Sequence, residues 1–124
     1  MLSGRNMKEY PEKRRYPRFV CEGGVEVRSA NSRPFWGTMS DISLGGCYVQ
    51  TFQPLAAGSV LQFLIKTEGV EIRGTAKVVA MHPGVGMAMA FAEMATPDRT
   101  RLDQLVAQLI ATDKHQGGGL MITP

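Results

Sequence analysis

The sequence has little of the material from which metal sites, disulfide frameworks and membrane spans are built. Among its 124 residues are two cysteines, Cys21 and Cys47, and two histidines, His82 and His115. These four residues do not stand at the spacing of metal ligands, and both cysteines lie in apolar stretches, which favours reduced, buried thiols. No apolar run approaches the roughly 18 residues of a membrane-spanning helix, and the N-terminus lacks the apolar core of a signal peptide. We therefore expect a cytoplasmic protein without a metal or a cofactor.

Sequence signatures of enzymes are missing as well. The chain has no phosphate-binding loop of the GxxxxGK[ST] type, no HExxH and no GxSxG. His82 precedes a proline in an expected turn, with no serine, cysteine or carboxylate at a spacing that suggests catalysis. We expect a binding protein and not an enzyme.

Positive charge is concentrated at the N-terminus. Residues 1–18 hold six Lys or Arg and two Glu, a net charge of +4, whereas the whole chain carries +3, which leaves −1 for the remainder. A protein that follows a nucleic-acid backbone is expected to spread its cations along a face. The focal charge disfavours a nucleic-acid polymer as the partner.

Most of the chain alternates between apolar and polar residues, with turn residues between the runs. Such a period of two is typical of strands with one buried face. Phe19, Cys21 and Val27 share the apolar side of the first run, with a bulge expected at Gly23-Gly24. The composition of Ser29–Pro34 predicts a turn. The expected strands cover about residues 19–28, 35–42, 47–52, 60–66, 70–78 and 86–92.

One amphipathic helix follows the strands. Thr96-Pro97 is typical of a helix N-cap followed by proline at the first helical position. Apolar residues then recur at helical spacing over about four turns, at Leu102, Leu105, Val106, Leu109 and Ile110. We expect the small residues of the last strand, Ala88, Ala90 and Ala92, to let this helix pack closely. Six short strands and one helix favour a mainly-β fold, a closed or nearly closed antiparallel barrel.

The cationic segment before the first strand is expected to be extended. Pro17 is excluded from a helix interior and moves Tyr16 out of the α region. In an extended chain Arg14, Tyr16 and Arg18 share one side, with the outer guanidiniums about 13 Å apart. Such a pair can clasp a wide anion, because guanidinium groups bind phosphate or the O6/N7 edge of guanine. The alternative interpretation is a solvated basic tail.

Two polar motifs together resemble the signature of the PilZ domain family, RxxxR followed by DxSxxG. The first is Arg14 to Arg18, and the second is Asp41, Ser43 and Gly46. The strand count and the trailing helix also match the family, over roughly residues 12–111. The resemblance implies a six-stranded antiparallel barrel with a C-terminal amphipathic helix. Residues 1–12 have no periodicity and are expected to form a flexible arm, followed by a single domain at 13–112 and a flexible tail at 113–124.

The resemblance implies a bacterial receptor for the second messenger cyclic di-GMP. Arg14 and Arg18 are then expected to hold phosphates and guanine edges, and Asp41 to accept hydrogen bonds from guanine N–H groups. Ser43 is expected to hydrogen-bond the ligand, and Gly46 to leave room for close approach. The complete set of expected ligand-binding residues is Lys13, Arg14, Arg15, Arg18, Asp41, Ser43, Gly45 and Gly46.

The output of such a receptor is open at this stage. We expect the arginine segment to become ordered on binding and to relay the signal to a downstream protein partner that the sequence does not identify. The second hypothesis is an adaptor of the same fold that binds proteins without any ligand. Trp36 lies near the second motif and is expected to serve packing, with stacking on a guanine as the alternative.

Overall fold

The computed structural model describes residues 16–120 and contains, within that range, six strands and one helix. The strands are β2 (Phe19–Ser29), β3 (Ser32–Ile42), β4 (Gly46–Gln50), β5 (Val60–Thr67), β6 (Val70–His82) and β7 (Gly86–Glu93), and the helix is α2 (Thr96–Leu120).

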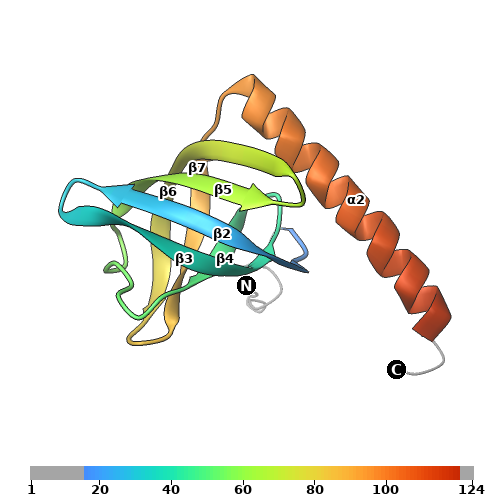
Figure 1. Ribbon diagram of the computed structural model, residues 1–124, viewed down its shortest axis with the longest axis horizontal. Helices are drawn as coiled ribbons and strands as arrows, with labels where there is room; N and C mark the ends of the chain where they lie inside the picture. Colours follow the sequence, from blue (N-terminus) through green and yellow to red (C-terminus); the bar gives the residue numbers. More distant parts are fainter. Residues whose placement is uncertain (1–15, 121–124) are drawn as a thin grey trace, which may run out of the picture.

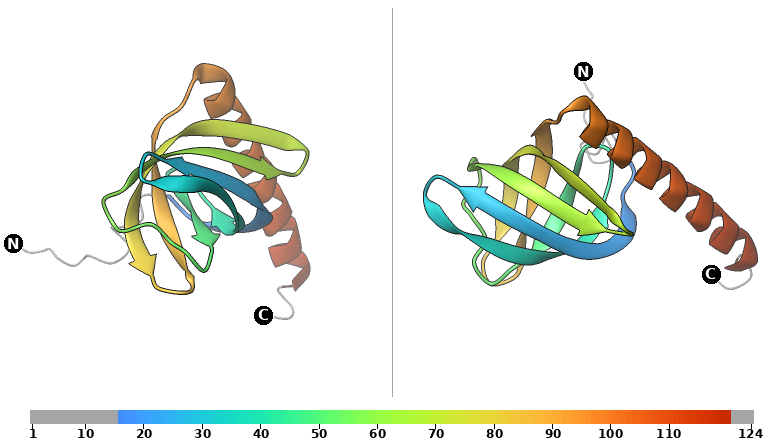
Figure 2. Two further views of the ribbon diagram at one scale, coloured as in Figure 1. Left: turned by 60° about the vertical axis from the view of Figure 1, so that its left-hand side comes forward. Right: turned by 45° about the horizontal axis from the view of Figure 1, so that its top comes forward.

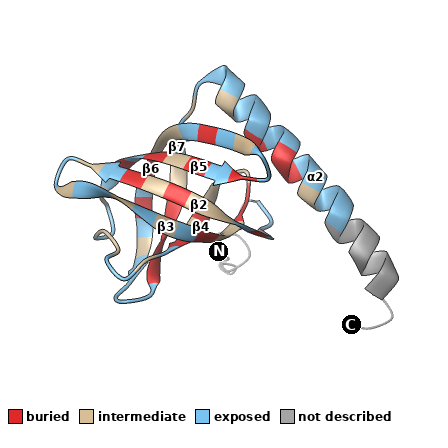
Figure 3. Ribbon diagram, in the orientation of Figure 1, coloured by how far each residue is buried: buried red, intermediate tan, exposed pale blue. Residues whose placement is uncertain are grey.

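The six strands form a closed antiparallel barrel, which confirms the predicted fold (Figure 1). Their order around the barrel is β2-β3-β4-β7-β6-β5, and β2 pairs with β5 to close it. The apolar side of each strand points inward, where residues such as Val25, Met39 and Ile72 are fully buried (Figure 3). Closure leaves most main-chain groups paired with a neighbouring strand.

Turns and bulges bound the strands, and some of them differ in position from the sequence prediction. Glu68 and Gly69 form the tight β5–β6 turn, with φ angles of 47° and 78°. The bulge in β2 falls between Val20 and Gly23, next to the predicted position. The predicted turn at Ser29–Pro34 is too long, because β3 already begins at Ser32. A register shift at this end of the β2–β3 pair accommodates Pro34, which lacks the N–H of a regular ladder.

The helix α2 packs mainly on β6 and β2 and then runs away from the barrel (Figures 1 and 2). Leu102, Leu105 and Val106 are buried against the barrel, as predicted, whereas Ile110 is 38% exposed. The first helical hydrogen bond joins the Arg99 N–H to the Ala95 carbonyl, one residue before the predicted cap. The helix also extends to Leu120, beyond the four turns predicted, because three glycines lower helix propensity without forbidding a helix.

The small residues of β7, which include Ala88, were expected to pack against the helix, but their main neighbour is a tyrosine of β4. The Tyr48 ring of β4 lies over it, so that a Cβ on Gly86 would come within 2.7 Å of that ring. In the register Tyr48 faces Ala88 directly. The bare face of β7 therefore accommodates an aromatic side chain of the barrel.

Candidate functional site

Two predicted site residues meet at the edge of the barrel where β2 begins and β3 ends. Arg18 stands just before β2, and Asp41 faces Val20 across the β2–β3 ladder. Their side chains lie with Arg18 Nη1 3.6 Å from Asp41 Oδ1, and they are 32% and 26% exposed. This separation defines an ion pair and is too long for a good hydrogen bond.

The Asp41 carboxylate has an oxygen atom without a donor. Its Oδ1 atom is buried and has no hydrogen-bond partner within the described part of the chain. A buried acceptor in this state costs free energy that a regular surface aspartate avoids. Groups of this kind are typical of binding sites, where an incoming N–H supplies the missing donor.

Ser43 is satisfied by its own turn. Its Oγ accepts the N–H groups of Gly45 and Gly46 at 3.0 and 3.2 Å and contacts the Gly46 carbonyl at 3.4 Å. The Ser43 N–H also donates to that carbonyl, at 2.8 Å. A hydroxyl has one donor and two acceptor positions, so these three contacts use its capacity. With only 6% of the residue exposed, Ser43 holds the turn in shape.

The two glycines of the turn, Gly45 and Gly46, allow other residues of the protein to approach the main chain closely. A Cβ on Gly46 would collide with the Met89 carbonyl of β7, so glycine here permits β4 and β7 to pair closely. A Cβ on Gly45 would stand 2.9 Å from the Tyr16 ring. The space at Gly46 that we expected a ligand to use is therefore occupied by β7.

Tyr16 connects the N-terminal segment to the turn. Its ring lies against Gly45 and is 41% exposed. Tyr16 and Arg18 thus bring the end of this segment to two of the predicted site residues, Asp41 and Gly45. The remaining predicted cations, Lys13, Arg14 and Arg15, lie outside the described residues.

The register reveals two neighbours of Asp41 that the motifs did not indicate. Val20 faces Asp41 from β2, and Tyr48 faces it from β4. Val20 is 82% exposed, and the Tyr48 hydroxyl lies 2.9 Å from His82 Nδ1. Directly opposed residues share a face of the sheet, so Val20, Asp41 and Tyr48 form one row on the outside of the barrel. This row follows from the strand register and cannot be predicted from the motifs.

Arg99 of α2 also reaches the turn, which no sequence signal indicated. Its Nη1 donates to the Leu44 carbonyl at 3.4 Å. The N-terminal part of α2 is anchored elsewhere by Asp98, whose Oδ1 accepts the main-chain N–H of Arg73 at 2.8 Å. The helix therefore contacts both the turn and β6.

Cys47 packs beneath the site as an inert thiol. It pairs with Ile42 and is 2% exposed, and Cys21 is also buried and free. Burial raises the pKa of the Cys47 thiol far above its ordinary value, and the charge of Asp41 raises it further. The predicted reduced core thiols agree with this placement.

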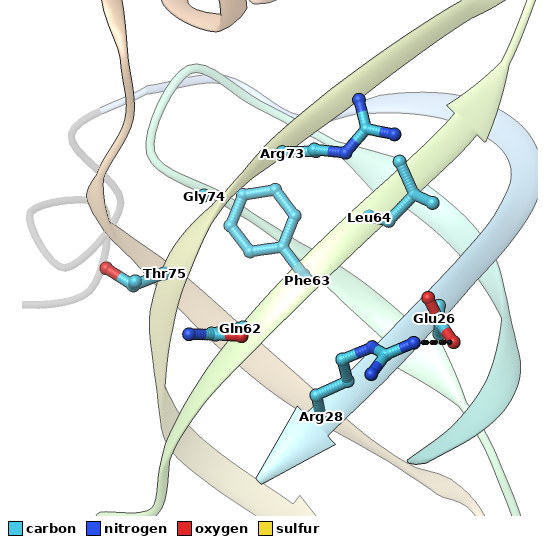
Figure 4. A pocket seen from close by; sticks show the side chains of 8 residues that line it. All are labelled: Glu26, Arg28, Gln62, Phe63, Leu64, Arg73, Gly74 and Thr75. Atoms are coloured by element: carbon cyan, nitrogen blue, oxygen red, sulfur yellow. Dashed lines mark hydrogen bonds and ion pairs between the residues drawn. The ribbon is translucent and has the colours of Figure 1, made fainter.

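A separate hollow of about 450 Å³ lies on the outer faces of β2, β5 and β6 (Figure 4). It contains Phe63 and Leu64, with Arg28 and Arg73 on either side. Both arginines are already paired, Arg28 with Glu26 and Arg73 with Glu71, each at 3.2 Å. None of the predicted ligand-binding residues that the structure describes lines this hollow, so we do not assign the site to it.

Within residues 16–112, whose side chains the structure describes, no group of three or more His, Cys, Asp or Glu side chains is placed to hold a metal ion. No helix in this part of the chain is both long and apolar enough to cross a membrane.

The closed barrel, the trailing helix and the Arg18–Asp41 pair define a small barrel domain with a polar site beside its β3–β4 turn. The PilZ domain family model matches residues 12–108, so the chain belongs to the PilZ domain family. Comparison with curated proteins finds no match.

Solved structures share the fold at low sequence identity. The PilZ domain with c-di-GMP of YcgR from Escherichia coli has 15% identity and a TM-score of 0.69, covering 86% of this chain and 98% of that one. MrkH of K. pneumonia, in its c-di-GMP complex, has 22% identity and a TM-score of 0.71, covering 83% and 55%. The Bacillus subtilis inhibitor of motility MotI has 20% identity and a TM-score of 0.65, covering 77% and 50%. The chain thus spans about half the length of MotI and MrkH.

Proposed function

We propose that this PilZ domain is a receptor for cyclic di-GMP. The observation that carries the proposal is the buried Oδ1 atom of Asp41, which lacks a hydrogen-bond donor among the described residues and stands beside the Arg18 guanidinium. The two side chains are partly exposed, 32% for Arg18 and 26% for Asp41, so a carboxylate and a guanidinium stand together at the edge of the barrel.

The chemistry of the ligand matches this pair. Guanine offers N1–H and N2–H donors that suit a carboxylate, and O6 and N7 acceptors that suit a guanidinium. The phosphates of the ligand suit further arginines. Val20 adds an exposed apolar surface beside Asp41, on which the face of a base can rest. In this arrangement Ser43, Gly45 and Gly46 shape the turn, and Asp41 and Arg18 contact the ligand.

Structural relatives support the assignment. YcgR and MrkH, both of the same fold, have been solved with c-di-GMP. Their identity to this chain is below 25%, so they support the fold only. The assignment of the site residues rests on the contacts of Asp41 and Arg18 and on the motif.

The cations before Tyr16 complete the proposed site. Lys13, Arg14 and Arg15 repel one another and Arg18 at close range, and two ligand phosphates offset part of that repulsion. Binding should therefore order this segment against the turn, near the place where Tyr16 already lies on Gly45. A downstream protein that reads the ordered segment would then relay the signal in the bacterial cytoplasm.

Limited trypsin digestion tests this ordering. Cleavage after Lys8, Lys13 and Arg15 should slow markedly at saturating cyclic di-GMP, whereas cleavage after Lys114, near the other end of the chain, should keep its rate. Equal rates with and without the ligand at the three N-terminal bonds would show that the arm takes no part in the mechanism. The assignment of Asp41 would not be affected by that result.

The second candidate is a ligand-independent adaptor. An adaptor has no need for a buried carboxylate oxygen without a donor, because that atom lowers stability and gives nothing in return. This observation favours the receptor. Titration calorimetry with cyclic di-GMP, with the linear dinucleotide as control, distinguishes the two: the receptor gives saturable heat with the cyclic compound, and an adaptor gives heat with neither.

A further inference from the structure

A second surface lies at the end of β3 opposite to Asp41. It is a cleft of about 550 Å³ between β3, the chain that leaves β4, and the β6–β7 turn. Three large apolar residues that line it are exposed, with Trp36 at 52%, Phe52 at 88% and Val85 at 58%. Exposed apolar residues that gather around one cleft are typical of interaction sites, in which tryptophan is a frequent anchor.

The cleft borders a strand edge without a partner. β3 pairs with β2 along its length from Ser32, whereas β4 pairs with it only from Thr38 onward. Beyond β4 the chain turns to the β6–β7 turn, where the Thr51 N–H donates to the Val85 carbonyl at 3.1 Å. In the described structure no strand pairs with the outer edge of residues 32–37, although Gly37 already lies against Val49 and Gln50 of β4. The β2–β3 hairpin projects on the side away from α2 (Figure 1).

A free edge selects an extended partner, because its unpaired N–H and C=O groups bond best to another main chain. Pro34 lies within this edge and contributes no N–H to any strand that adds there. The residues that line the cleft are uncharged, and the exposed Arg33 places a positive charge on the edge itself. An extended segment with acidic residues fits both features.

We propose that this surface binds an extended, acidic segment of a partner protein. The segment adds as a strand to residues 32–37 of β3 and places an aromatic or aliphatic side chain between Trp36 and Phe52. This site is separate from Asp41 and Arg18, at about five residues along β3 or roughly 17 Å. It stands independently of cyclic di-GMP binding.

The test uses a phage-displayed library of random 12-residue peptides against the full chain. Phe52→Ser serves as the counter-target, since a residue 88% exposed can be changed without loss of core packing. Val60→Ser is the matched control, because Val60 is 66% exposed and lies outside the cleft lining. We expect enriched peptides with an aromatic residue flanked by Asp or Glu. The synthetic peptide should bind Phe52→Ser at least tenfold more weakly and Val60→Ser equally well.

Single N-methylation along the selected peptide then tests strand addition. Only every second N–H faces β3, so methylation should abolish binding at alternate positions and leave it unchanged between them. A peptide that binds wild type and Phe52→Ser equally would overturn the proposal, as would sensitivity without alternation or no enrichment at all. A wild-type dimer in solution that Phe52→Ser converts to a monomer would also overturn it, because the occupant would then be a second copy.

Discussion

The β3–β4 turn and the ion pair beside it differ in how their polar atoms are satisfied. In the turn, Ser43 uses its full hydrogen-bonding capacity on the main chain of Gly45 and Gly46. In the pair, Asp41 Oδ1 is buried without a donor among the described residues, 3.6 Å from Arg18. A motif whose residues appear equivalent in the sequence thus separates into a scaffold and a recognition element. Substitutions in the two regions should have opposite signatures.

The largest effect on stability is expected from Gly46→Ala. Its Cβ would collide with the Met89 carbonyl, and a main-chain atom of a paired strand has little freedom to move. The free energy of unfolding should fall by about 3 kcal/mol, at the upper end of the usual cost of overpacking. Urea denaturation measures it. Gly45→Ala is the control, since the partly exposed Tyr16 ring can shift, and it should cost less than about 1 kcal/mol. Equal losses for both variants would contradict the role assigned to Gly46.

Asp41→Ala should have the opposite signature. Its affinity for cyclic di-GMP should fall by about 1–3 kcal/mol, the value of one bidentate base contact, and Arg18→Ala and Arg14→Ala should fall similarly. The stability of Asp41→Ala should stay equal or rise, because the variant removes a buried acceptor without a donor. Arg5→Ala, outside the motif, should bind like wild type. Similar losses for Arg5→Ala and Arg18→Ala would indicate a diffuse basic patch.

Ser43→Ala should reduce stability more than it reduces ligand affinity. It leaves the N–H groups of Gly45 and Gly46 without their acceptor, which should lower the free energy of unfolding by about 2 kcal/mol. Binding should weaken only as far as the turn loses its shape. Denaturation and calorimetry on the same sample separate the two effects. A variant of wild-type stability that no longer binds would show that Ser43 contacts the ligand directly.

The smallest effect is expected from Arg99→Met, which tests whether the turn depends on α2. The contact of Arg99 with the Leu44 carbonyl is exposed and 3.4 Å long, so its loss should cost less than about 0.5 kcal/mol. Thermal unfolding and ligand affinity should both stay close to wild type. A clear loss of affinity would show that the helix holds the turn in its binding shape.

Much of the fold can be predicted from local sequence patterns, whereas the separate roles of the residues in the site cannot. The alternation of Phe19, Cys21 and Val27 correctly predicted the first strand, and six short strands with a single helix correctly predicted the barrel. The roles of Ser43 and Asp41 depend on hydrogen bonds within a few ångströms, which residue spacing does not encode. The neighbours of Asp41 depend on strand register for the same reason. The predicted helix of about four turns is too short, since α2 continues to Leu120 through three glycines that lower helix propensity without ending the helix.

The most direct test of the account is a coupling measurement between Asp41 and the guanine 2-amino group. Titration calorimetry would compare cyclic di-GMP with cyclic di-IMP, which lacks that group, on wild type and Asp41→Ala. A hydrogen bond to a charged acceptor contributes about 1.5–3 kcal/mol, so wild type should bind cyclic di-GMP more tightly by about tenfold or more. In Asp41→Ala the two ligands should bind alike. A preference that persists unchanged in Asp41→Ala, or a wild type that binds neither ligand, would contradict the assignment of Asp41 as the acceptor for guanine.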